Sequence, residues 1–150
     1  MEYGLRLDAA ALLVASGLVA ALAASASGAA ELSLIPGLYQ VEVRISLPNV
    51  QDVAAPLLLT RCIGPDDLKS GQAFFVLSDN PLKHCQLVDY QTTASAALYR
   101  IVCAGPNKGS AVAVFDTREG SFRGTIRMNM GGKNMTMSET QSARRTGNCP

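Results

Sequence analysis

The sequence lacks tryptophan, contains a single histidine, His84, and has only 17% charged residues. Its cysteines form no Cys-x-x-Cys pair, so the usual ligand set of a zinc site is missing. No Gly-x-Ser-x-Gly, His-Glu-x-x-His or glycine-rich phosphate loop is present. Lys and Arg number 13 against 12 Asp and Glu, without the basic excess typical of nucleic-acid-binding proteins. We therefore predict a protein that is not an enzyme and binds no nucleic acid.

An uncharged run of small and apolar residues occupies positions 9–24. It is shorter than the roughly 20 apolar residues that a membrane-spanning helix requires. Ala24-x-Ala26 fits a signal-peptidase site and predicts a signal peptide over 1–26, with cleavage after residue 30 as the alternative. A retained membrane anchor is the competing interpretation. Cleavage would leave an exported protein with no stable membrane span.

All cysteines follow this predicted signal peptide: Cys62, Cys85, Cys103 and Cys149. Four cysteines in an exported chain indicate two disulfides, for which three connectivities are available. The segments 85–91 and 97–103 read as a hairpin that places Cys85 opposite Cys103. A cross-strand disulfide fits this arrangement, and it leaves Cys62 to pair with Cys149.

Alternation of apolar and polar residues is the main structural signal. It is clearest over 39–47, and further short runs lie between turn residues, including a short strand expected at 73–77. A short helix is expected near 65–70, because Pro65 suits a first helical turn and early aspartates complement the helix dipole. Together these signals predict one antiparallel all-β domain over 31–150, with about seven or eight short strands. The sheet is expected to be curved, or to close partly into a barrel or sandwich.

The sequence predicts which residues pair across the strands of two hairpins. In the hairpin with Cys85 and Cys103, Leu87 is expected opposite Ile101 and Asp89 opposite Tyr99. In the last hairpin, over 121–142, a two-residue turn at Gly131-Gly132 supplies the positive φ angles that such turns require. This turn places one set of apolar residues on a single face, with the pairs Met128–Met135, Ile126–Met137 and Phe122–Gln141.

Methionines are the most suggestive chemical feature of that hairpin: Met128, Met130, Met135 and Met137. Thioether sulfur is a soft ligand suited to Cu(I), which makes these four residues a candidate copper site. The alternative is that methionine simply fills an irregular core face, and the alternation with polar residues favours this alternative. No cofactor is therefore expected, with copper as the alternative.

Arginines also lie on the polar faces of the expected strands: Arg44, Arg100, Arg123 and Arg127. They form either a basic patch for an anionic partner or an ordinary solvated sheet face. The adjacent carboxylates Asp66 and Asp67 have a structural explanation at the helix start, and no nucleophile is expected beside Asp89.

Several short motifs occur together in a recognisable order: Pro36-Gly37-Leu38-Tyr39, Cys62-x-x-Pro65-x-Asp67-Leu68, Asp89-Tyr90 and Gly147-Asn148-Cys149-Pro150. Because it carries these motifs in this order, the chain resembles an uncharacterised family of exported bacterial proteins, domain of unknown function 3617 (DUF3617). Tyr39 stands where tryptophan is expected in the family. The resemblance implies a periplasmic or secreted bacterial protein and brings no established activity.

The sequence thus predicts a disulfide-stabilised, non-enzymatic protein of the cell envelope. A curved antiparallel sheet offers a concave face for a small apolar ligand or a protein partner. Cu(I) binding by the methionine-rich hairpin is the alternative function.

Overall fold

The computed structural model describes residues 30–150 except 51–54, 106–107 and 133–134. The predicted signal peptide, 1–26, lies outside these residues. Within the described part, no helix is both long and apolar enough to cross a membrane.

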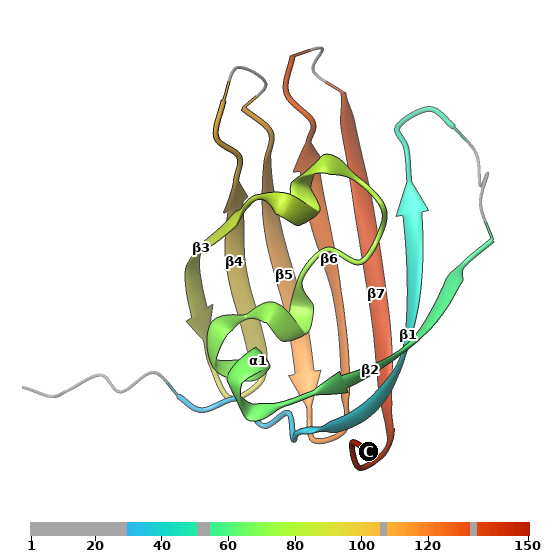
Figure 1. Ribbon diagram of the computed structural model, residues 1–150, viewed down its shortest axis with the longest axis vertical. Coiled ribbons are helices and arrows are strands. Elements are labelled where there is room, and N and C mark those ends of the chain that lie inside the picture. The colour runs from blue at the N-terminus through green and yellow to red at the C-terminus, as the bar shows by residue number, and fades with distance from the viewer. Residues whose placement is uncertain (1–29, 51–54, 106–107, 133–134) are drawn as a thin grey trace, which may run out of the picture.

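Seven antiparallel strands form one open sheet in the order β2-β1-β7-β6-β5-β4-β3 (Figure 1). This confirms the predicted all-β class. The strands are β1 Gly37–Ser46, β2 Leu57–Ile63, β3 Gln86–Thr92, β4 Ala96–Val102, β5 Ser110–Arg118, β6 Ser121–Asn129 and β7 Thr136–Gly147.

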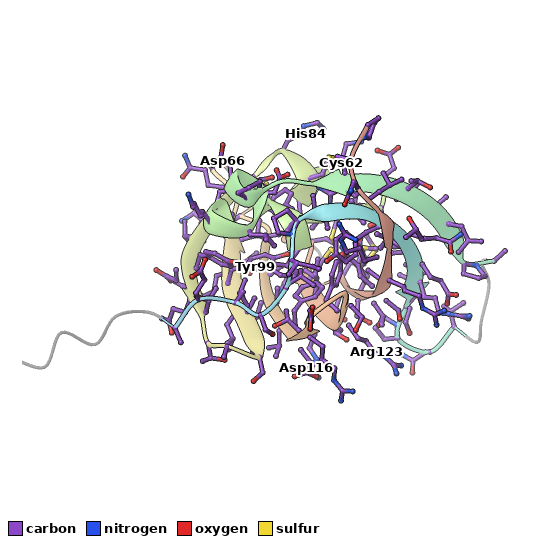
Figure 2. All side chains as sticks on the ribbon, turned by 90° about the horizontal axis from the view of Figure 1, so that it is seen from below. Cys62, Asp66, His84, Tyr99, Asp116 and Arg123 are labelled. Atoms are coloured by element: carbon purple, nitrogen blue, oxygen red, sulfur yellow. A yellow bond between two sulfur atoms is a disulfide. The ribbon has the colours of Figure 1, made fainter. Side chains whose placement is uncertain are left out.

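Strands β2 and β3 follow each other in the sequence but form the two opposite edges of the sheet. The chain between them, residues 64–85, crosses one face of the sheet and contains α1 (Pro65–Ser70) and two 3₁₀ turns, η1 (Gln72–Phe74) and η2 (Pro81–His84). We call residues 64–85 the closing segment and the face that it covers the inner face. Seen from below, the sheet curls around this segment (Figure 2).

The helix predicted near 65–70 is confirmed as α1. It starts with Pro65, and the Gly64 N–H donates to Asp67 Oδ2 at 2.8 Å, which satisfies a donor that the helix itself leaves free. Gly71 ends the helix at φ 81°, a left-handed conformation that glycine adopts without steric cost.

The prediction of a strand at 73–77 is wrong. The backbone carbonyls of this segment accept hydrogen bonds from side chains of the sheet instead of from a neighbouring strand: Arg61 Nη1 to Ala73 at 3.3 Å, Tyr99 Oη to Phe74 at 2.7 Å and Gln141 Nε2 to Phe75 at 2.8 Å. The continuous apolar run at 73–77 reflects packing against the core, not strand pairing.

The core lies between the inner face and the closing segment. Phe74, from η1, packs its ring 5.1 Å from that of Phe115 and 5.2 Å from that of Phe122, centroid to centroid. All three rings are buried, and their burial stabilises the closing segment on the sheet.

The two disulfides join the pairs that the sequence favours. Cys62 and Cys149 tie the end of β2 to the tail after β7, with an S–S distance of 1.99 Å. Cys85 and Cys103 tie the chain before β3 to the chain after β4, at 2.03 Å.

The register of β6 and β7 differs from the prediction by two residues. Met128 pairs with Met137 and Ile126 with Glu139, and the Met130 N–H donates to the Met135 carbonyl at 2.8 Å. Four residues, 131–134, therefore separate the bonded Met130 and Met135, whereas the prediction placed only Gly131-Gly132 in the loop. A shift by two leaves the same side chains on the same face, so the predicted faces survive although the pairs do not.

In the β3–β4 hairpin, Leu87 lies opposite Ile101 as predicted, but Asp89 does not pair with Tyr99. The register shifts between Val88 and Gln91, which marks a β-bulge, and Asp89 has φ 54°. The sequence alternation gave no sign of this extra residue.

A buried carboxylate joins the sheet to the closing segment. Glu139, on β7, is fully buried, and its Oε1 accepts from the Leu77 N–H at 2.9 Å and from Gln141 Nε2 at 2.7 Å. Its Oε2 accepts from the Ser78 N–H at 3.0 Å and from the Ser78 hydroxyl. Four donors thus satisfy one carboxylate that has no ion-pair partner among the described residues.

Replacing Glu139 with alanine should destabilise the fold, because it leaves buried backbone and side-chain donors without an acceptor. We expect the free energy of unfolding to fall by about 3–5 kcal/mol, measured by urea denaturation followed by circular dichroism. The same change at Glu42, which lies partly exposed on the other face of the sheet, should cost less than about 0.5 kcal/mol. Equal losses in the two variants would contradict the anchoring role of Glu139.

Candidate functional site

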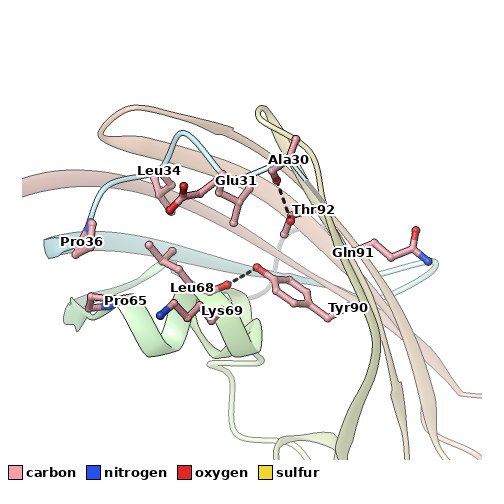
Figure 3. Close-up of a pocket in the computed structure, with 11 residues that line it drawn as sticks. Ala30, Glu31, Leu34, Pro36, Pro65, Leu68, Lys69, Tyr90, Gln91 and Thr92 are labelled. Atoms are coloured by element: carbon pink, nitrogen blue, oxygen red, sulfur yellow. Dashed lines mark hydrogen bonds between the residues drawn. The ribbon is translucent and has the colours of Figure 1, made fainter. Parts of the chain in front are cut away.

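A groove of about 820 Å³ opens at the β3 edge of the sheet (Figure 3). Three separate parts of the chain form its walls: the lead-in to β1 (residues 30–36), α1 and β3. We call it the edge groove. Its lining residues are Ala30, Glu31, Leu32, Leu34, Pro36, Pro65, Leu68, Lys69, Tyr90, Gln91 and Thr92. The volume lies within the range of small-molecule sites.

Hydrogen bonds hold the lead-in beside the sheet. Thr92 Oγ1 donates to the Ala30 carbonyl at 3.2 Å, and the Ser33 N–H donates to the Ala94 carbonyl at 3.0 Å. The Tyr39 hydroxyl donates to the Ile35 carbonyl at 2.6 Å. Backbone and side-chain bonds at both ends thus fix one wall of the groove.

Tyr90 connects the two other walls. Its hydroxyl donates to the Leu68 carbonyl of α1 at 2.7 Å (Figure 3). The bulge in β3 explains why this tyrosine is available: Asp89 forms an ion pair with Arg100 on the face opposite α1, so Tyr90 takes the inner-face position. Sequence analysis missed Tyr90 because alternation alone assigns that position to Asp89.

The groove is lined by both apolar and ionisable side chains. Leucine and proline side chains from the lead-in and α1 give it apolar walls, whereas Glu31, Lys69 and Tyr90 are its ionisable groups. Burial raises the pKa of Tyr90 to about 12, so its hydroxyl remains protonated and acts as a donor at neutral pH. Such a site suits a ligand with an apolar body and a polar end.

A family model described as "Protein of unknown function (DUF3617)" matches residues 34–149. The chain belongs to this family. The match begins at Leu34, within the lead-in, and covers α1 and β3, so most of the edge groove lies in the DUF3617 domain. Comparison with curated proteins and with solved structures gave no match.

The methionines of this DUF3617 domain lie where β6 ends and β7 begins, and Figure 1 shows that part of the hairpin at the end of the sheet opposite α1. Met128 is 2% exposed and pairs with Met137, which together with Met130 packs partly buried against the core. Met135, in contrast, is 59% exposed. The structure thus gathers three of the four predicted residues at the core and leaves one at the surface.

The remaining candidates are two carboxylates with structural contacts and one exposed histidine. Asp67 caps α1, Asp89 pairs with Arg100, and His84 is exposed. In the described ranges, no three His, Cys, Asp or Glu side chains are placed to hold a metal ion together. The expected concave face is filled by the closing segment, whose Ala73 and Phe74 are fully buried. The open space therefore lies at the sheet edge.

Burial of Tyr90 should make the free energy of unfolding decrease at alkaline pH. Its pKa is about 12 in the folded chain and about 10 in an unfolded one. The folded state therefore holds the phenolic proton more tightly, and this stabilisation is complete below pH 10 and lost as the pH rises towards 12. At neutral pH, Tyr90→Phe removes the hydrogen bond to the Leu68 carbonyl, so its free energy of unfolding should be about 1 kcal/mol lower than that of the wild type.

Urea denaturation of the wild type and of Tyr90→Phe at pH 8, 10 and 11 measures this effect, because the buried Tyr39 and Tyr99 are present in both proteins. The wild type should lose more stability with rising pH than Tyr90→Phe does. Parallel pH profiles would show that Tyr90 is not buried against α1.

Proposed function

We propose that this protein is exported by a bacterium and binds, without catalysing a reaction, a small ligand with an apolar body in the edge groove. The apolar walls that the lead-in and α1 contribute carry this proposal. A protein partner that inserts an apolar side chain is the alternative occupant. The groove volume of about 820 Å³ favours a whole small molecule.

Export is supported by the chemistry of the cysteines. Cys62 with Cys149 and Cys85 with Cys103 form two disulfides, and no described cysteine is free. Disulfides of this kind form and persist in the periplasm or outside the cell, and are rare in a reducing cytoplasm. The uncharged run at 9–24 supports the same location as a signal peptide.

The preferred ligand follows from the apolar and the charged side chains that line the groove. Leu32, Leu34 and Leu68 provide apolar contact, and burying a ligand chain against them is favourable by about 25 cal/mol per Å². Lys69 is exposed and has no ion pair within the described part of the chain. A single carboxylate near Lys69 and an acyl chain along the leucines would satisfy both features.

The absence of catalysis is proposed from the groups that line the groove. Its ionisable side chains are a carboxylate, an ammonium group and a phenol that donates to a backbone carbonyl. These groups include no nucleophile held by a neighbouring base, which covalent catalysis requires.

Palmitate is a suitable probe, with affinity measured by displacement of a fluorescent fatty acid. Leu32→Asp should weaken binding at least about tenfold, because it places a charge against the acyl chain. Leu98→Asp is the matched control, since Leu98 is exposed on the sheet face opposite the closing segment and does not line the groove. Lys69→Gln should weaken the binding of palmitate more than the binding of hexadecanol, which lacks the carboxylate. Equal effects of Leu32→Asp and Leu98→Asp, or no binding of either probe, would contradict the proposal.

Cu(I) binding by Met128, Met130, Met135 and Met137 is a second candidate function. One observation favours it: Met128 and Met137 are direct cross-strand neighbours on the inner face, and Met130 follows just after the end of β6. Side chains in that relation lie about 5–8 Å apart, close enough for small movements to bring two sulfurs to one ion.

Titration with Cu(I) against a competing chelator tests this candidate. The copper proposal predicts competition that a variant with all four methionines replaced by leucine loses. The matched control is Met135→Leu alone, which alters only the exposed sulfur and should retain most of the binding. No competition by the wild type would remove copper from consideration.

A further inference from the structure

The outer face of the sheet, opposite the closing segment, carries six exposed arginines: Arg44, Arg100, Arg118, Arg123, Arg127 and Arg144. Two of them are neutralised locally, because Arg44 pairs with Glu42 at 2.6 Å and Arg100 pairs with Asp89. The other four form no ion pair within the described part of the chain.

Three of these four arginines lie on adjacent strands at one end of the sheet. Arg118 on β5 is opposite Ser121, and Arg123 on β6 is opposite Ser142. Since Ser121 and Arg123 are two residues apart on β6, Arg118 and Arg123 are diagonal neighbours. Arg144 on β7 pairs with Ser121 and is likewise diagonal to Arg123. Diagonal neighbours lie about 7–8 Å apart, so long side chains reach a shared point.

The same residues line a hollow of about 640 Å³ on the outer face. Figure 2 shows Arg123 and Asp116 projecting on the side of the molecule away from α1. Ser121, Ser142 and Gln40 add neutral hydrogen-bonding groups to the hollow. Its two carboxylates are Glu42, which Arg44 already engages, and Asp116, which lies opposite Arg123 on β5 without forming an ion pair.

We propose that this hollow binds a phosphate group. Three arginines that line one hollow repel one another, and an anion bound between them reduces that repulsion. Arginine recognises phosphate by paired N–H···O bonds, and three arginines with two serine hydroxyls match the several oxygens of one phosphate better than the two oxygens of a carboxylate. The site shares no residue with the edge groove and stands apart from the function proposed there.

The phosphate comes either from a lipid headgroup or from a soluble molecule, and two assays separate these sources. Flotation with vesicles of phosphatidylcholine, with and without phosphatidylglycerol, measures binding to a membrane. Chemical-shift changes on titration with inorganic phosphate measure binding of the free anion. Chloride at matched ionic strength controls for general screening.

The decisive variant is Arg118→Gln with Arg144→Gln. Its matched control is Arg100→Gln with Arg127→Gln, which removes the same charge from the same face outside the hollow. Each arginine that engages the anion contributes roughly fivefold to affinity, so the first variant should lose about 25-fold. The control should lose less than about fivefold, because Asp89 already neutralises Arg100 and Arg127 lies outside the hollow. Both variants should fold, since all four side chains are exposed.

Binding of anionic vesicles that depends on the first pair supports the site and assigns it to a lipid headgroup. Binding of free phosphate alone, with the same dependence, supports the site and assigns it to a soluble ligand. Equal losses in both double variants would show a response to net charge and overturn the proposal. Absence of binding in both assays would overturn it as well.

Discussion

The carboxylate of Glu139 accepts hydrogen bonds from Leu77 and Ser78 in the closing segment, and the remaining architecture depends on this anchor. A seven-stranded open sheet with one apolar face cannot be stable in water until that face is covered. The closing segment covers it because Phe74 packs into the aromatic core while Glu139 satisfies the backbone that runs beside it. An apolar residue at position 139 would leave those backbone donors unpaired.

The edge groove is a consequence of the same arrangement. The closing segment must span from the β2 edge to the β3 edge, and it places α1 beside β3, where Tyr90 bonds to it. The two disulfides hold the ends of this bridge, since Cys62 precedes the closing segment and Cys85 lies at its end. Walls that are fixed before a ligand arrives lose little conformational freedom on binding. The groove is therefore preorganised by features that primarily secure the fold.

Much of the fold was predictable because its signals are local. Alternation identified the strands, the Pro-Asp-Asp sequence identified α1, and the hairpin geometry favoured the observed disulfides. The errors have equally physical causes. A two-residue slip of β6 against β7 preserves both faces, so alternation does not distinguish the registers. The 73–77 segment is a continuous apolar run followed by turn residues, as a short strand would be, yet its hydrogen-bond partners are the side chains of Arg61, Tyr99 and Gln141, which only the folded sheet brings near.

The edge groove and the arginine hollow were beyond sequence reasoning for a related reason. The groove combines residues near positions 30, 68 and 90, and the hollow combines Arg118, Arg123 and Arg144 from three strands. Their assembly depends on strand order and on the bulge at Asp89. The sequence identified Arg123 as a candidate but grouped it with Arg44 and Arg100, whose charges are engaged by neighbouring carboxylates.

Native mass spectrometry of the protein isolated from the cell envelope, with both disulfides intact, tests the central claim that the edge groove holds a small ligand. We expect an added mass that mild activation removes, present in the wild type and in Leu98→Asp but absent from Leu32→Asp. A clean mass of the protein alone, or an adduct that Leu32→Asp retains, would contradict the account.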